Sequence, residues 1–175
     1  MWRKRFPIDD QQVRQVKDVE RSRKRTMDRA VRLLAAKPRS IGELRQRLLE
    51  KLWTDESIVD AVLDKLKEYR YVDDEQYARD LALSRLRQRP QGRRRLEQTL
   101  SQKKLDPETI RGALDSAFEG MPEDELISAA LEKFLRLRGR PQTRQDLKKI
   151  YDHLLRRGFS YSLIREKIAD IGRVE

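Results

Sequence analysis

The pattern of apolar residues along the chain repeats, which indicates an array of similar helical units. A shift of 52 positions aligns the first copy with the second, placing Ala30 on Ala82, Leu34 on Leu86, Pro38 on Pro90, Leu44 on Leu96, Leu48 on Leu100 and Ile58 on Ile110. A further shift of 54 positions reaches a third copy, placing Leu96 on Ile150, Leu100 on Leu154, Leu105 on Phe159 and Ile110 on Ile164. Within each copy the apolar positions recur at three and four residues, which is typical of amphipathic helices.

Start and stop signals divide each copy into three short helices. In the first copy a helix is expected to begin near Thr26 and to end before Pro38, because the residue that precedes proline is disfavoured in the α region. Thr54 or Asp55 is expected to cap the third helix of that copy. Asp106 stands at the same place in the second copy, directly before a proline that suits the first helical turn.

The sequence therefore predicts an all-α protein, an elongated curved array of three tandem three-helix repeats. Ala, Glu, Lys, Leu and Arg make up about half of the chain, which is the composition of helices rather than of sheets. A unit of this size has a marginal core of its own, so neighbouring units are expected to pack together. The expected division is a basic extension over residues 1–25, followed by repeats over 26–70, 71–120 and 121–175.

Composition argues against most enzyme chemistry. There is no cysteine and a single histidine, His153, so metal ligation by these side chains is disfavoured. The acidic run Asp73–Glu75 stands at a predicted helix start, where carboxylates cap free amides. We therefore expect no enzymatic activity, no catalytic or metal-binding residues and no cofactor. No apolar run approaches the roughly 18 residues that cross a bilayer, so we expect a monomeric cytoplasmic protein with no membrane partner.

The net charge of +11 is unevenly distributed. Residues 85–104 and 133–157 each carry +7, residues 1–25 carry +5, and residues 106–125 carry −6. Each +7 block contains the turn between the first and second helices of a repeat. If both turns face one way, they form a positive stripe suited to phosphates, although an acidic protein surface is also a candidate partner.

The candidate binding residues are the basic side chains of these two blocks. The first group is Arg85, Arg87, Arg89, Arg93, Arg94, Arg95, Lys103 and Lys104, and the second is Arg136, Arg138, Arg140, Arg144, Lys148 and Lys149.

A run of residues within the second repeat resembles a known family. Tyr71-Val72-Asp73-Asp74-Glu75-Gln76-Tyr77-Ala78, followed by Arg85, Gly92, Leu96 and Leu100, is similar to the central signature of the RecX regulatory proteins, which are built from tandem three-helix repeats. The resemblance covers roughly residues 26–171. In that family a glycine commonly ends the middle helix of a repeat, whereas here Leu52 and Lys104 take its place and only Gly158 retains it.

The resemblance implies a modulator, usually an inhibitor, of the RecA recombinase. Such a protein binds in the groove of the RecA filament on single-stranded DNA, limits ATP hydrolysis, strand exchange and coprotease activity, and so acts in homologous recombination, DNA repair and the SOS response. Double-stranded DNA is a further candidate partner. The residues leave open whether the filament is capped or its groove blocked, and whether the effect is inhibition or activation. The alternatives are a general DNA-binding helical protein that acts independently of RecA, and a helical adaptor for an acidic protein.

Overall fold

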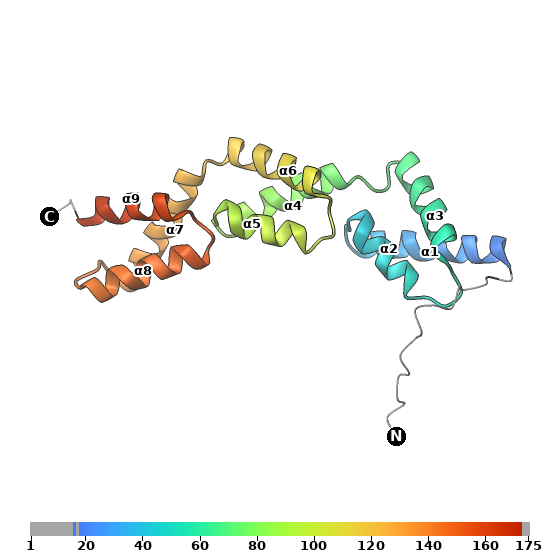
Figure 1. Cartoon of the computed structure of the whole chain (residues 1–175), viewed down its shortest axis with the longest axis horizontal. Coiled ribbons are helices and arrows are strands. Elements are labelled where there is room, and N and C mark those ends of the chain that lie inside the picture. The colour runs from blue at the N-terminus through green and yellow to red at the C-terminus, as the bar shows by residue number, and fades with distance from the viewer. Residues whose placement is uncertain (1–15, 17, 173–175) are drawn as a thin grey trace, which may run out of the picture. The chain divides into compact units, whose positions relative to one another are not determined.

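The computed structural model describes residues 16 and 18–172, and over these residues the chain forms nine α-helices and no β-strand (Figure 1). The predicted all-α repeat protein is confirmed. The described residues form two compact units. The first contains the described residues up to Pro38 together with Glu43–Tyr71, and the second contains Arg39–Gly42 and the described residues from Val72 onward.

The first unit is built from α1 (Val19–Ala36), α3 (Glu56–Glu68) and all but the first two residues of α2 (Ile41–Leu49), with α1 packed against α3. Asp55 caps α3 by accepting a hydrogen bond from the Ile58 amide at 2.9 Å, as predicted. Leucine and valine side chains from α2 and α3 are buried in this unit, among them Leu44, Leu48, Val59, Val62 and Leu66.

Helix α1 ends at Ala36, which confirms the break predicted before Pro38. Its start at Val19 corrects the prediction of a start near Thr26. The last residues of the expected extension are therefore regular helix rather than loosely ordered chain, while residues 1–15 and 17 lie outside the described part.

Buried hydroxyl groups explain this earlier start. Ser22 and Thr26 are buried, although both are polar and escape a search for apolar periodicity. The Ser22 hydroxyl donates to the Trp53 carbonyl oxygen at 2.5 Å, and the Thr26 hydroxyl lies 3.0 Å from that of Thr54. Asp18 caps the first turn of α1 by accepting a hydrogen bond from the Arg21 amide at 2.9 Å. These contacts join α1 to the turn before α3.

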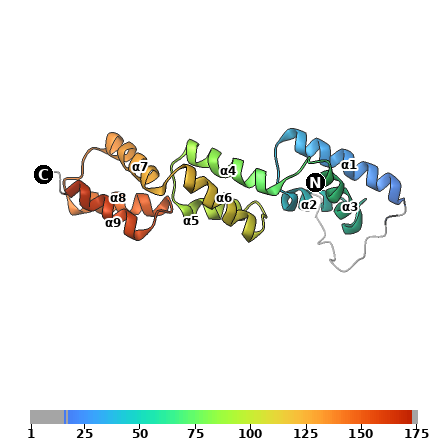
Figure 2. The ribbon, with the colours of Figure 1, turned by 90° about the horizontal axis from the view of Figure 1, so that it is seen from above.

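The second unit contains two groups of three helices around one continuous apolar core. Helix α4 lies beside α6, as Figure 2 shows, and α7, α8 and α9 pack against one another. The helices are α4 (Asp74–Gln88), α5 (Arg93–Ser101), α6 (Pro107–Gly120), α7 (Glu123–Arg138), α8 (Arg144–Arg156) and α9 (Tyr161–Gly172).

Small side chains allow α4 and α6 to approach closely. Ala78 and Ala82 of α4 and Ala113 and Ala117 of α6 are all buried. Buried contacts of this kind gain dispersion energy only where the surfaces fit without gaps.

The expected caps of the second unit are present. Asp73 accepts from the Gln76 amide at 2.9 Å at the start of α4. Asp106 accepts from the Thr109 amide at 2.9 Å, with Pro107 in the first turn of α6. The acidic run that begins at Asp73 therefore has the helix-capping role that its position predicted.

A glycine contact recurs at two equivalent places in the second unit. The backbone at Gly42 lies against Lys104, and the backbone at Gly92 lies against Gly158, so closely that a β-carbon on either glycine would overlap its neighbour. Lys104 and Gly158 both have a positive φ, +56° and +84°. Leu52, the equivalent position of the first repeat, does not adopt this conformation.

Each of these contacts is accompanied by a carboxylate at the start of the middle helix. The Ile41 amide donates to Asp74 at 2.8 Å, and the Arg93 amide donates to Glu123 at 3.0 Å. In both cases the acidic residue lies in the first turn of the following repeat. A helix start has free amides that require an acceptor, and here the next repeat supplies it.

Candidate nucleic-acid interface

The first basic block lies on α4, on α5 and around their ends. Arg93 is the member most engaged within the protein, since its guanidinium forms an ion pair with Asp115 of α6 and lies 5.9 Å from the Phe118 ring centroid. Its backbone amide is the one that donates to Glu123. Arg93 therefore links α5 to the acidic helix α6 and is a poor candidate for binding a separate anion.

The other members of this block differ in how freely they face solvent. Within the described part of the chain, Arg85, Arg87 and Arg94 are exposed and form no ion pair. Arg95 is exposed at its tip, where it contacts Gln98 at 3.4 Å, but its backbone packs against Gly158. Lys103 and Lys104 lie in the turn that follows α5, where the Lys103 carbonyl oxygen accepts a hydrogen bond from the Ser40 hydroxyl.

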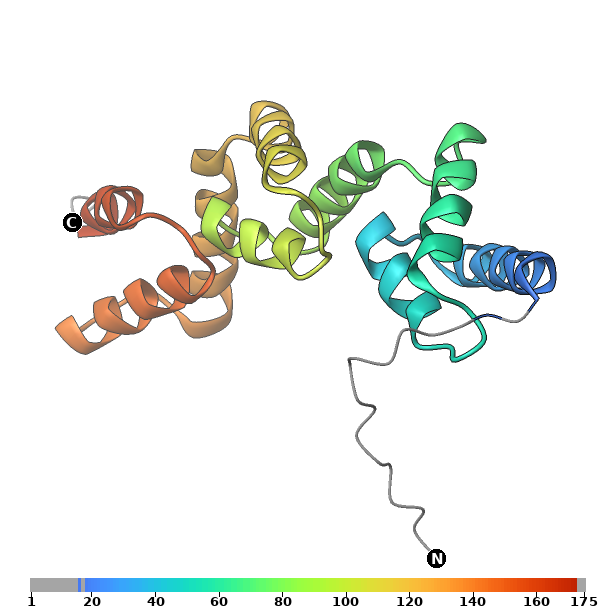
Figure 3. The same cartoon turned by 45° about the vertical axis from the view of Figure 1, so that its right-hand side comes forward.

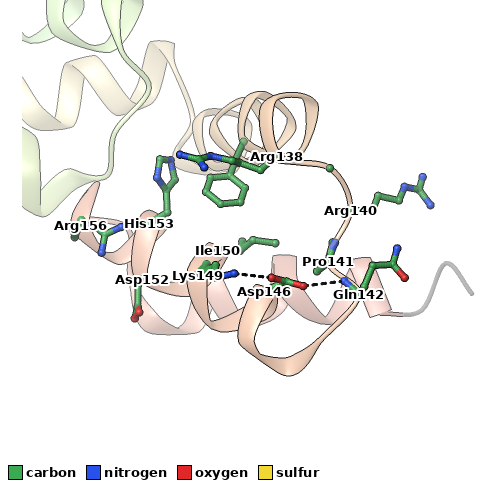
Figure 4. A pocket seen from close by; sticks show the side chains of 12 residues that line it. Arg138, Arg140, Pro141, Gln142, Asp146, Lys149, Ile150, Asp152, His153 and Arg156 are labelled. Atoms are coloured by element: carbon green, nitrogen blue, oxygen red, sulfur yellow. Dashed lines mark hydrogen bonds and ion pairs between the residues drawn. The ribbon is translucent and has the colours of Figure 1, made fainter.

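The second basic block borders a groove of about 640 Å³ between the end of α7 and one face of α8 (Figure 4). Three of the predicted residues, Arg138, Arg140 and Lys149, line it. Arg136, Arg144 and Lys148 are exposed elsewhere on the same helices. The structure thus brings together only part of the predicted second group.

Acidic side chains also border this groove and reduce its positive charge. Asp146 accepts from Lys149 at 2.9 Å and from the Thr143 hydroxyl at 2.8 Å, and the Asp146 amide is held in turn by Thr143, which caps α8. The lysine and threonine hydrogen bonds lower the pKa of Asp146 to about 2. Asp152 also lines the groove. Lys149 is therefore paired, whereas Arg144, Lys148 and Arg156 of α8 are exposed and form no ion pair in the described structure.

A cluster of three arginines joins Arg89, one of the predicted residues, to Arg156 and Arg157, which were not among them. Arg156 and Arg157 end α8, and the Arg157 guanidinium donates to the Pro90 carbonyl oxygen of the α4–α5 turn at 2.8 Å. This hydrogen bond brings Arg157 close to Arg89, which caps the end of α4. Burial lowers the pKa of Arg157, and the charge of Arg89 lowers it further. The doublet is visible in the sequence, but its proximity to Arg89 is a tertiary feature.

His153 lies one turn before this cluster, where its ring packs on Phe134 with 4.8 Å between ring centroids. Burial of the imidazole lowers its pKa, and the charges of Arg157, Arg156 and Arg89 add to this effect. His153 is therefore neutral near pH 7. The sequence contains no second histidine that could act with His153, whereas the fold brings three arginines near its ring.

The two turns of the basic blocks lie at opposite ends of α8. The turn that contains Arg140 leads into the first residue of α8, whereas the α4–α5 turn docks on its last residues, where the Gly92 amide donates to the Arg157 carbonyl oxygen at 2.9 Å (Figure 3). Helix α8 has 13 residues, so about 20 Å separates these ends. Basic side chains therefore occur along the length of α8, interrupted by Asp146 and Asp152.

Metal-binding clusters and membrane-spanning helices are both absent from residues 16 and 18–172. That segment contains no group of three or more His, Cys, Asp or Glu side chains arranged to hold a metal ion. None of its helices combines the length and the apolar character needed to cross a bilayer.

These features define a class: a tandem three-helix repeat protein whose second unit has a basic surface around one helix. Three family models match the chain in order, RecX first three-helix domain over residues 27–66, second over 73–114 and third over 122–168. The chain therefore belongs to the RecX family of regulatory proteins, which confirms the resemblance noted in the sequence.

Curated relatives agree with this assignment. The chain is 37% identical over 143 residues to the regulatory protein RecX of Chlorobaculum tepidum, a match that covers 81% of this chain and 85% of that protein. It is 34% identical over 140 residues to the regulatory protein RecX of Treponema pallidum, covering 80% of this chain and 81% of that protein.

Solved structures share the fold. The crystal structure of RecX from Lactobacillus salivarius aligns with a TM-score of 0.77 at 22% identity and covers 87% of this chain and 98% of that one. A second structure, titled crystal structure of regulatory protein RecX, aligns with a TM-score of 0.73 at 26% identity and covers 85% of this chain and 73% of that one.

Proposed function

We propose that this protein binds the RecA filament on single-stranded DNA and inhibits its recombinase, ATPase and coprotease activities. Membership of the RecX regulatory family supports the partner. The protein acts by binding rather than by catalysis, as a monomer and in the cytoplasm, where the RecA filament forms on DNA. Duplex DNA is a secondary partner.

One observation carries the DNA part of this proposal: exposed arginines without carboxylate partners lie on the second unit, on both sides of the α4–α5 turn and at the ends of α8. Backbone phosphates bind such side chains because the interaction releases condensed counterions. Arg93 and Lys149 contribute less, since Asp115 and Asp146 already neutralise them.

The DNA-contacting set follows from this distinction. The exposed predicted residues with no ion pair in the described structure are the ones assigned to DNA phosphates: Arg85, Arg87, Arg89, Arg94, Arg95, Lys104, Arg136, Arg138, Arg140, Arg144 and Lys148. We assign the three repeats to contacts with successive RecA protomers, because a repeat protein and a filament both present the same surface at intervals.

Co-sedimentation with preformed RecA filaments tests the proposal. We expect the protein to pellet with RecA on single-stranded DNA at a salt concentration where single-stranded DNA alone retains little of it, and to slow ATP hydrolysis by the filament. The triple variant of Arg85, Arg87 and Arg94 to alanine should inhibit at least about tenfold less well. Arg111 and Arg165, exposed arginines outside both basic blocks, provide the matched control as a double alanine variant.

Two results would contradict the proposal. Equal retention by DNA alone, with a steep salt dependence and no gain from RecA, would favour a general DNA-binding protein. Absence of binding to any oligonucleotide at low salt would favour an adaptor for an acidic protein.

A further inference from the structure

The junction between the α4–α5 turn and the end of α8 holds like charges together. Arg157 donates to the carbonyl oxygen of Pro90, the residue that follows Arg89 in the chain. Arg156 precedes Arg157 at the end of the same helix. Within the described part of the chain, none of these three arginines forms an ion pair with a carboxylate. The three side chains Arg89, Arg156 and Arg157 are called the junction arginines below.

Arg157 has unused hydrogen-bonding capacity at this place. A guanidinium carries five N–H donors. The Nε atom of Arg157 is buried and has no acceptor in the described structure. A buried donor without a partner costs free energy, and more so when the group is charged and other cations surround it. An anion between the junction arginines would supply both the acceptor and the missing negative charge.

The surroundings favour a phosphate of a chain over a small isolated anion. The groove that starts beside Arg156, His153 and the side chain of Arg138 continues along α8 to Arg140, as Figure 4 shows. His153 is a further hydrogen-bond donor at the near end. A nucleic-acid strand could place one phosphate at the junction arginines and others further along the same helix.

We propose that the junction arginines form a binding site for one backbone phosphate of a single-stranded nucleic acid, and that the bound phosphate tightens the packing of the α4–α5 turn on α8. The phosphate accepts from guanidinium groups on both sides of this junction, so it links the second repeat to the third. In the free protein the same groups repel one another. Nucleic-acid binding and junction stability are therefore coupled through the same three side chains.

This phosphate site extends the proposed function, because it names an element that binds DNA. It rests on the proposed function only for its role at the RecA filament. The experiments that test the phosphate site are done without RecA. A failure to bind RecA and a failure to bind an oligonucleotide at these arginines are therefore distinguishable results.

The first measurement is the salt dependence of binding to a fluorescent oligothymidylate. The Arg89→Ala, Arg156→Ala double variant keeps the Arg157 hydrogen bond to Pro90 and so preserves the junction. We expect its affinity to fall about tenfold, and the slope of log K against log salt to become shallower by about 0.7 for each phosphate that the variant no longer neutralises. The Arg111→Ala, Arg165→Ala control should leave both quantities near those of the parent protein. A slope equal to that of the control would overturn the site.

Thermal unfolding is the second measurement, and it separates a phosphate site from an ordinary surface charge. Arg89→Ala should raise the melting temperature of the free protein, because it removes a like charge beside Arg157, and it should reduce the rise caused by oligothymidylate. A variant that is destabilised when free and still fully stabilised by the oligonucleotide would contradict the proposal. An equal rise with inorganic pyrophosphate at the same phosphate concentration would identify a small phosphate as the ligand and overturn the nucleic-acid assignment.

Discussion

The backbone amide of Gly92 donates a hydrogen bond to the carbonyl oxygen of Arg157, 2.9 Å away, and this interaction seats the α4–α5 turn on the end of α8. Gly92 is buried, and its α-carbon faces the backbone of Gly158 so closely that no side chain fits. Gly42 meets Lys104 in the same way at the preceding junction. Close backbone packing at these turns thus adds to the continuous apolar core that holds the helices of the second unit together.

Gly92→Ala should destabilise the second unit by about 1–3 kcal/mol, because the added methyl group overlaps backbone that cannot rotate away. Gly112→Ala is the matched control. Gly112 lies inside α6 with no atoms near the position of a β-carbon, so the change should stabilise the helix by about 0.5–1 kcal/mol. Urea unfolding followed by circular dichroism measures both, and a Gly92→Ala protein as stable as the parent would refute the steric explanation.

Thr26→Val should destabilise the first unit by about 1–3 kcal/mol, because it leaves the buried Thr54 hydroxyl without its partner at 3.0 Å. The double variant with Thr54→Val removes both hydroxyls and should recover part of this loss. Denaturant unfolding of the parent protein, the two single variants and the double variant gives a double-mutant cycle. Strict additivity of the two single effects would show that the hydroxyls do not interact.

Arg93→Ala and Arg94→Ala should separate stability from binding, although the two residues are adjacent. Arg93→Ala removes the ion pair with Asp115, and because 42% of the arginine side chain and 60% of the aspartate side chain are exposed, we expect a loss of at most about 1 kcal/mol. Arg94→Ala should leave the unfolding free energy unchanged and weaken oligonucleotide binding. Thermal unfolding and fluorescence anisotropy on both variants test this, and identical behaviour of the two would count against the distinction.

The pKa of His153 should make oligonucleotide binding depend on pH. In the free protein this pKa lies below its ordinary value of 6.5, through burial first and then through Arg157, Arg156 and Arg89. The neutral ring therefore contributes stability above pH 6.5 that is lost as the pH falls toward the folded-state pKa. A phosphate among these arginines offsets their charge and raises the pKa of His153, so binding takes up a proton.

Affinity for oligothymidylate should consequently increase from about pH 7.5 to about pH 6, by more than it does for His153→Gln. The other groups that face this ring are Phe134 from α7, together with Arg138 and Asp152, which line the same groove. Parallel pH profiles for the two proteins would exclude His153 as the titrating group.

Periodicity was sufficient to predict the repeats because the side chains that fill this core recur at helical spacing. The helix caps were predictable because they are local: Asp55, Asp73 and Asp106 accept hydrogen bonds from amides two or three residues away in the chain. The start of α1 escaped prediction because its buried contacts are made by Ser22 and Thr26, whose hydroxyls find partners across the unit. Polar residues carry no periodic signal when their partners are distant.

Local spacing thus accounts for the fold class, the helix boundaries set by nearby caps and the family. It also located two basic blocks, but it could not distinguish a neutralised arginine from a free one. Arg93 is paired because α6 brings Asp115 to it, whereas the junction brings Arg157 to Arg89 and to the carbonyl oxygen of Pro90. Electrostatic energy depends on distance in space, and only folding brings together charges that are separated in the chain.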